Sequence, residues 1–114
     1  MKNHNITAVE AYLSSLEKHD LSLAPMDDEI SFDNPVAGKG AGAENLTAFL
    51  SGFLPAIKSV RILQHVSEGD YVVTHWEADT VFGIIPMLEK FHVIDGKIAE
   101  TIAYFDPRPI IGGS

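Results

Sequence analysis

Residues 87–106, MLEKFHVIDGKIAETIAYFD, contain two strand-like runs separated by the pair Asp95-Gly96. An Asp-Gly pair between two apolar runs is the strongest short-range signal for a tight hairpin. Two further strand-like runs precede this hairpin, and glycine-containing turns separate them. We therefore expect four consecutive antiparallel strands, at 57–67, 71–82, 87–94 and 97–106.

The first half of the chain carries helical patterns instead. Thr7 and Glu10 form a T-x-x-E capping box, which predicts the start of a helix. Apolar residues from Leu46 to Leu54 follow the spacing i, i+3, i+4, i+7, i+8 and predict a second helix that Pro55 ends. Helices followed by antiparallel strands are typical of an α+β domain, with the helices packed on one face of a curved antiparallel sheet.

Between the two helices, the stretch LSLAP at 21–25 predicts a short helical turn. A brief strand at 29–34 follows, and Pro35 closes it. Successive side chains of a strand point to opposite faces, so Asp33 and Asn34 are expected to point in opposite directions. The following GKGAG at 38–42 resembles a phosphate-binding loop, but its glycine spacing and surroundings favour a flexible loop at the edge of the domain.

Composition narrows the classes of function. The chain has 114 residues, which predicts a single domain over 1–114, and a net charge of −8 with eight scattered basic residues. Such a charge disfavours nucleic acid as a partner, because binding to phosphates requires Lys and Arg. The absence of cysteine excludes disulfides and thiolate metal sites. Without an apolar run long enough for a signal peptide or a membrane span, we expect a cytoplasmic protein with no membrane partner.

The alternation of side chains predicts which face of each strand is buried. In 71–82 the even positions are mostly apolar, so the even face should pack against the core. In 87–94 a lysine and a histidine mark one face as outer, which leaves Glu89 on an otherwise apolar inner row. The last strand is apolar on both faces, with Ile98, Ile102 and Tyr104 assigned to the outer one. We therefore expect a homodimer through the outer face of the sheet.

The order of these elements, with DNPVAG at 33–38 and DGKIAETIAYFDP at 95–107, resembles the nuclear transport factor 2-like superfamily. Within it, the chain is most similar to the SnoaL-like polyketide cyclases and the ketosteroid isomerases, over a core of about residues 7–107. The resemblance implies a cone-shaped domain with an apolar pocket between the helices and the concave side of the sheet. It also implies a hydrophobic small-molecule ligand.

The resemblance implies roles for three residues. Tyr12 matches the tyrosine of the isomerase oxyanion hole, and Glu89 matches the acid that is kept protonated beside it. The isomerase base is an Asp directly before a proline, and that position here is Asn34. An amide cannot take a proton at neutral pH, so the isomerase mechanism lacks its base. Asn34 should then point into the cone and Asp33 away from it.

The residues expected to line the pocket lie on the strand at 29–34, on the second helix and on the last three strands. They are Phe32, Phe49, Phe53, Thr74, Trp76, Ala78, Met87, Phe91, Thr101, Ala103 and Phe105. Limonene epoxide hydrolases resemble this chain and also keep an asparagine like Asn34, but they need an Asp-Arg-Asp set. The matching positions read Trp76, Ala78 and Ala103, which disfavours epoxide hydrolysis.

Two hypotheses about function follow. The first is an enzyme that transfers a proton on a small hydrophobic carbonyl compound, with Glu89 as the acid/base and Tyr12 and Asn34 holding the reacting oxygen or a water. It would need no cofactor or metal. The alternative is a non-catalytic ligand-binding or association domain of the same fold. In that case Tyr12 and Asn34 would supply hydrogen bonds to a ligand without turnover. Each residue also has a structural alternative: Glu89 at a solvated rim, Tyr12 reaching solvent or backbone, and Asn34 capping the strand end.

A group of polar residues could imitate a metal site. The group comprises His65, His75, Glu77, Asp79 and His92. Histidines and carboxylates are common metal ligands. We place all five on the outer face of the sheet, where polar residues are expected anyway, and favour a solvated or dimer-contact surface.

Overall fold

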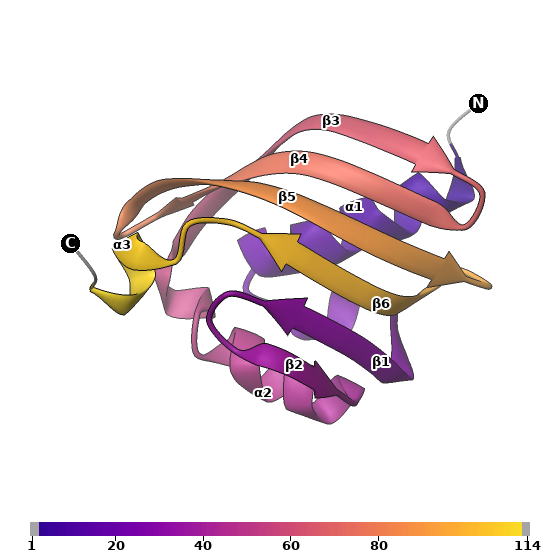
Figure 1. Ribbon diagram of the computed structural model, residues 1–114, viewed down its shortest axis with the longest axis horizontal. Helices are drawn as coiled ribbons and strands as arrows, with labels where there is room; N and C mark the ends of the chain where they lie inside the picture. Colours follow the sequence, from indigo (N-terminus) through magenta and orange to yellow (C-terminus); the bar gives the residue numbers. More distant parts are fainter. Residues whose placement is uncertain (1–2, 113–114) are drawn as a thin grey trace.

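Six strands form one curved sheet, and helices cover one of its faces (Figure 1). The computed structural model describes residues 3–112. In chain order the elements are α1 (His4–Glu17), the 3₁₀ turn η1 (Leu21–Leu23), β1 (Met26–Asn34), β2 (Gly38–Ala41), α2 (Ala43–Ser51), the 3₁₀ turn η2 (Leu54–Ala56), β3 (Ile57–Glu68), β4 (Tyr71–Thr80), β5 (Gly83–Ile94), β6 (Lys97–Tyr104) and α3 (Arg108–Ile111). The predicted α+β fold is confirmed.

The strands lie in the order β2-β1-β6-β5-β4-β3. Strands β3 to β6 form the predicted antiparallel meander. The sheet is mixed, because β1 pairs with β2 in the antiparallel sense and with β6 in the parallel sense. This parallel pairing places the first strand of the chain beside the last one, so that the N-terminal and C-terminal halves share one sheet.

Helix α1 begins earlier than the sequence predicts. Asn3 is its N-cap, and the side chain of Asn3 accepts a hydrogen bond from the backbone N of Asn5 at 2.7 Å. Thr7 lies inside the first turn, where its hydroxyl donates to the carbonyl of Asn3 at 3.3 Å. The predicted capping box is therefore wrong. Asparagine is as good an N-cap as threonine, and the earlier start lets Ile6 pack against the core.

The helices bury one side each against the sheet. Val9 and Leu13 of α1 are fully buried, and Leu46 of α2 is 2% exposed. Helix α2 ends before the predicted position, and Pro55 lies in η2, so Phe53 falls between the helix and the 3₁₀ turn. Within the described residues, no helix is both long enough and apolar enough to cross a membrane.

The glycine-rich stretch after β1 is a strand rather than the predicted loop. Strand β2 pairs with β1, and Gly40 lies directly opposite Phe32. A Cβ atom at Gly40 would lie only 2.4 Å from the Cζ atom of Phe32, so the ring of Phe32 occupies the space that a side chain would need. Glycine has a low strand propensity, which is why the sequence pattern misses β2.

The predicted inner rows of β4 and β5 are confirmed, and the two strands keep one register through Pro86. In β6 the prediction for Ile98 is wrong, because this side chain is fully buried. Phe91 pairs with Thr101, whereas Val93 pairs with Ile98, so β6 carries one extra residue between these pairs. Such a bulge reverses the alternation of side chains along the strand.

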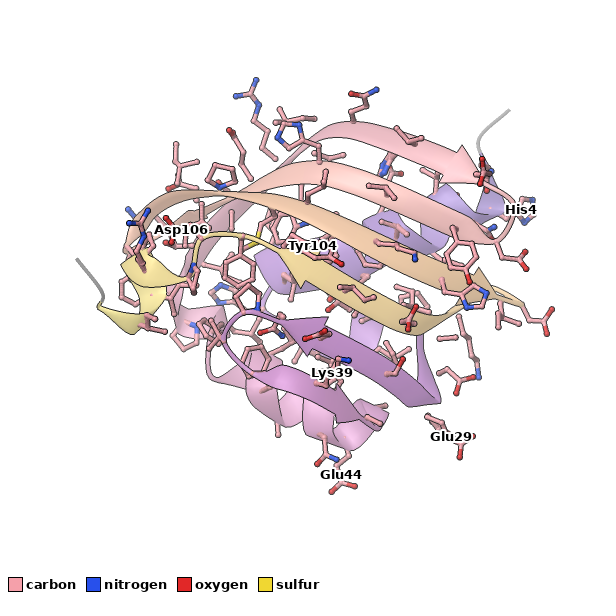
Figure 2. All side chains as sticks on the ribbon, viewed as in Figure 1. His4, Glu29, Lys39, Glu44, Tyr104 and Asp106 are labelled. Atoms are coloured by element: carbon pink, nitrogen blue, oxygen red, sulfur yellow. The ribbon has the colours of Figure 1, made fainter. Side chains whose placement is uncertain are left out.

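The outer face of the sheet exposes several apolar side chains. Leu88 and Tyr104 are directly opposed on β5 and β6 and are 48% and 60% exposed, and Val66 on β3 is 57% exposed. Together they border a groove with Val73 and His75. Figure 2 labels Tyr104 on this face. Exposed apolar surfaces of this kind mark protein–protein contact sites in other proteins, which is the basis for the prediction that follows.

We expect two copies of the chain to associate through this face. Leu88→Asp would place a charge in the interface and should weaken the dimer by on the order of tenfold or more, because burying an unpaired carboxylate is costly. Val81→Asp is the matched control, since Val81 is 60% exposed in the β4–β5 turn, outside the groove. Sedimentation equilibrium at micromolar concentration measures the change. A monomeric wild type would contradict the prediction.

Candidate functional site

A cavity of about 100 Å³ lies between the helices and the inner face of the sheet. Its wall is almost entirely apolar and draws on α1, α2, η2, α3 and every strand except β2. Most of the predicted pocket residues border it, namely Phe32, Phe49, Phe53, Trp76, Ala78, Met87, Thr101, Ala103 and Phe105. The cavity is therefore where the sequence analysis expects the ligand pocket.

Two predicted lining residues do not border the cavity. Thr74 hydrogen-bonds His65, with 2.7 Å between Oγ1 and Nδ1. Phe91 is fully buried and packs edge-on against Tyr12, with the ring centroids 5.5 Å apart. Both residues are on the predicted inner face. They belong, however, to the part of the sheet on which α1 rests, so core packing replaces the pocket there.

The sequence analysis missed part of the wall. Leu16 and Leu46 contribute from the helices, Ile85 and Phe82 contribute from the β4–β5 hairpin, and Ile110 contributes from α3. Helix α3 was not predicted at all. The signal that would have found it is a proline in the first turn followed by Gly112, which ends the helix in the left-handed conformation at φ 76°.

Glu89 lies in the middle of β5, and only 4% of its surface is exposed. Both carboxyl oxygens accept a hydrogen bond. Trp76 Nε1 donates to Oε1 at 3.2 Å, and the Thr101 hydroxyl donates to Oε2. Burial raises the pKa of Glu89 from 4.5 to about 7, although the two hydrogen bonds oppose the change. The alternative of a solvated rim position is therefore wrong for Glu89.

Tyr12 borders the same cavity and is 2% exposed. Burial raises the pKa of its phenol well above 10, and the nearby charge of Glu89 raises it further. The phenol is consequently neutral across the physiological range and can donate a hydrogen bond. The alternative in which Tyr12 reaches solvent does not hold, because α1 presents it to the cavity and to Phe91.

Asn34 borders the cavity at the end of β1. Its Oδ1 atom accepts hydrogen bonds from the backbone N of Val36 at 3.0 Å and of Ala37 at 2.7 Å. The capping alternative is therefore correct for this oxygen, while the Nδ2 group remains available for a ligand. Asp33 also borders the cavity, although β1 keeps an unbroken register with β2 through Asn34.

The polar residues considered as a metal site are dispersed. His65 is on the inner side, not the outer face, because a register shift between Ile62 and Gln64 reverses the alternation in β3. It bonds Glu10 Oε2 at 3.1 Å through Nε2. His92 stacks on Tyr71 with the ring centroids 4.4 Å apart. Across residues 3–112, no three side chains of the ligating types are grouped to hold a metal ion.

The fold and the position of the cavity define an NTF2-like cone with a pocket. Residues 9–101 match the family described as the SnoaL-like domain, and the chain belongs to this family. No match was found among curated proteins.

Three solved structures illustrate the likeness. A protein from Kribbella flavida DSM 17836 is 23% identical, with a TM-score of 0.85, over 94% of this chain and 90% of that one. An NTF2-like protein from Cytophaga hutchinsonii ATCC 33406 is 19% identical, with a TM-score of 0.82, over 97% of both chains. An LEH-like epoxide hydrolase from M. tuberculosis is 23% identical, with a TM-score of 0.76, over 96% of this chain and 88% of that one. At these identities the likeness concerns the fold.

Removing the titration of Glu89 should change how stability depends on pH. Between pH 4.5 and about 7 the folded protein keeps a proton that the unfolded chain has lost, so its stability falls as the pH rises through this window. The full cost, reached above pH 7, is roughly 3 kcal/mol. Glu89→Gln stays neutral and escapes this cost. The free energy of unfolding of Glu89→Gln, compared with that of wild type at the same pH, should therefore rise by roughly 2–3 kcal/mol from pH 4.5 to pH 8.

Urea unfolding of both proteins at several pH values measures the gain. Glu100→Gln on β6 is the matched control, since this residue is only partly buried. If the difference in free energy of unfolding between wild type and Glu89→Gln is the same at every pH, the raised pKa of Glu89 is contradicted.

Replacing Asn34 tests its structural role. Asn34→Ala removes the acceptor of two backbone hydrogen bonds and should lower the free energy of unfolding by about 1–2 kcal/mol. Asn34→Asp keeps an acceptor oxygen, so its free energy of unfolding should fall much less. Chemical denaturation of the two variants measures the difference. Equal losses for both variants would show that the turn does not depend on this oxygen.

Proposed function

We propose that this protein is an enzyme that transfers a proton on a small hydrophobic carbonyl compound, using Glu89 as the acid/base. The observation that supports this most strongly is the carboxyl group of Glu89 in an apolar cavity, with a pKa of about 7. A general acid/base is most effective when its pKa lies near the operating pH, because both protonation states are then populated.

Tyr12 supplies the second part of the proposed chemistry. Its neutral phenol lines the cavity with Glu89 and can donate a hydrogen bond to a carbonyl oxygen. A donor in an apolar site stabilises the negative charge that develops on such an oxygen more strongly than water would. The Nδ2 group of Asn34 would hold the ligand or a water from the end of β1.

The proposed proton transfer has two steps. The Glu89 carboxylate removes a proton from the carbon next to the carbonyl group, and the C–H bonding electrons move into an enolate whose oxygen accepts a hydrogen bond from Tyr12. Protonated Glu89 then returns the proton to carbon, and the carbonyl group is restored. Trp76 and Thr101 position the carboxyl group, since each donates to one of its oxygens.

A second candidate function is a ligand-binding domain without catalysis. It draws on the same hydrogen bonds, because a carboxyl group whose two oxygens are already engaged can be a fixed polar contact rather than a base. Asn34, in place of an isomerase-type aspartate, also fits this alternative. The two functions differ in whether a bound ketone loses its α-protons.

Exchange of α-protons in D₂O, followed by NMR, tests the proposal without knowledge of the natural substrate. Wild type should accelerate exchange in cyclohexanone, with a rate that rises with pH and levels off above about 7, because the base form is needed. Glu89→Gln should be slower by roughly 10²–10⁴-fold, the usual contribution of a positioned general base. Tyr12→Phe should be slower by a smaller factor.

Glu100→Gln is again the matched control and should exchange at the wild-type rate. Binding of the ketone is measured separately for each variant. If cyclohexanone binds and Glu89→Gln exchanges its α-protons as fast as wild type, the enzyme proposal is wrong and the ligand-binding alternative is supported.

A further inference from the structure

We infer that the cavity takes an uncharged carbonyl compound about the size of one six-membered ring, and that Ile110 in α3 sets this size limit. The inference rests on the proposed function, because it names the substrate class of the same site. It gives a size and a charge to the hydrophobic small-molecule ligand that the resemblance implies.

The size of the cavity is the first observation. Its volume is about 100 Å³. An engineered apolar protein cavity of roughly 150 Å³ takes benzene, and pockets for drug-sized ligands measure roughly 300–1,000 Å³. The cavity is smaller than that benzene site, so it limits a ligand beside Glu89 to one ring at most and excludes a fused multi-ring compound.

The second observation is what closes the cavity. At its deep end lie side chains that are almost fully buried, among them Tyr12, Trp76 and Glu89. Toward the surface, Phe82 of the β4–β5 turn and Ile110 of α3 complete the wall, and Phe82 is 48% exposed. Figure 1 shows α3 beside this turn, at the end of the sheet. A longer ligand that extended outward on this side would meet the side chains of Ile110 and Phe82.

A local ion pair lies at the start of helix α3. Asp106 accepts hydrogen bonds from the backbone N of Arg108 at 3.0 Å and from its guanidinium group, at 2.9 Å for Nε to Oδ1 and 2.6 Å to Oδ2. This pairing lowers the pKa of Asp106 to about 2. Figure 2 shows Asp106 beside α3. The bidentate contact orders the segment that leads into the helix, two residues before Ile110.

The third observation is the charge of the wall. Among the described residues that border the cavity, Glu89 and Asp33 are acidic and none is Lys, Arg or His. A ligand carboxylate would be buried next to Glu89 without a cation to pair with, which is costly in an apolar environment. A neutral carbonyl group, by contrast, can accept a hydrogen bond from Tyr12. The wall therefore selects uncharged ligands.

Binding measurements test the inference independently of catalysis. Trp76 borders the cavity and is the one tryptophan in the sequence, so its fluorescence reports on ligand entry, with titration calorimetry as a second readout. The probes at pH 8 are cyclohexanone, 2-decalone and a tetracyclic ketosteroid. Methyl cyclohexyl ketone and cyclohexanecarboxylate form a pair that differs in charge. Wild type should bind cyclohexanone at least tenfold more tightly than either larger ketone, and the methyl ketone at least tenfold more tightly than the carboxylate.

Two variants should relax the size limit. Ile110→Ala removes the side chain that closes the cavity and should strengthen binding of 2-decalone by at least fivefold. Phe82→Ala should act in the same direction and carries the test if Ile110→Ala does not fold. The matched control is Ile111→Ala, because the neighbouring Ile111 is 61% exposed and does not border the cavity. This control should bind every probe as wild type does.

Four results would overturn the inference. They are wild-type binding of 2-decalone or the ketosteroid as tight as that of cyclohexanone, equally tight binding of the carboxylate, no binding of cyclohexanone, or equal effects of Ile110→Ala and Ile111→Ala. Failure of the proposed function is a separate outcome. If the expected order of binding is found but wild type exchanges no α-protons, the inference stands and catalysis is excluded. If exchange occurs fastest on the larger ketones, catalysis stands and the inference is wrong.

Discussion

The burial of one carboxyl group is the constraint on which the arrangement of this protein depends. A buried carboxyl group must have both oxygens satisfied, because an uncompensated buried charge costs several kcal/mol. Here the two donors come from the strands on either side of β5, Trp76 from β4 and Thr101 from β6. The pairing of three neighbouring strands is thus tied to the chemistry of Glu89. The strand register and the site are specified together.

The inner face of the sheet divides into two regions with different occupants. Along one part, α1 rests directly on the strands, and Phe91 and Thr74 are used in packing and in the hydrogen bond to His65. Along the other part, the cavity lies between the helices and the strands. Tyr12 and Glu89 lie where the two regions meet. Both residues therefore border the cavity while being almost fully buried, which is the usual arrangement of preorganised sites.

The sequence predicts the parts of this structure that depend on regular alternation. The inner position of Glu89 and Trp76 follows from an unbroken period of two in β4 and β5. Prediction fails where the period breaks, as at Ile98 and His65, since a single extra residue in a strand leaves no mark in composition. It also fails at β2 and α3. Their strand and helix propensities are low, and tertiary contacts decide their conformation.

The extra residue in β6 has a consequence for how the chain tolerates changes in length. Ile98 on one side of it and Thr101 on the other both face inward only because β6 carries one residue more than β5 between their partners. Deleting a single residue between them would leave the loops of the protein unchanged. It would turn one of the two segments over, so that either a core aliphatic residue or the donor to Glu89 would face solvent. Related chains that retain both residues should therefore show no length variation at this position, even where their sequences diverge.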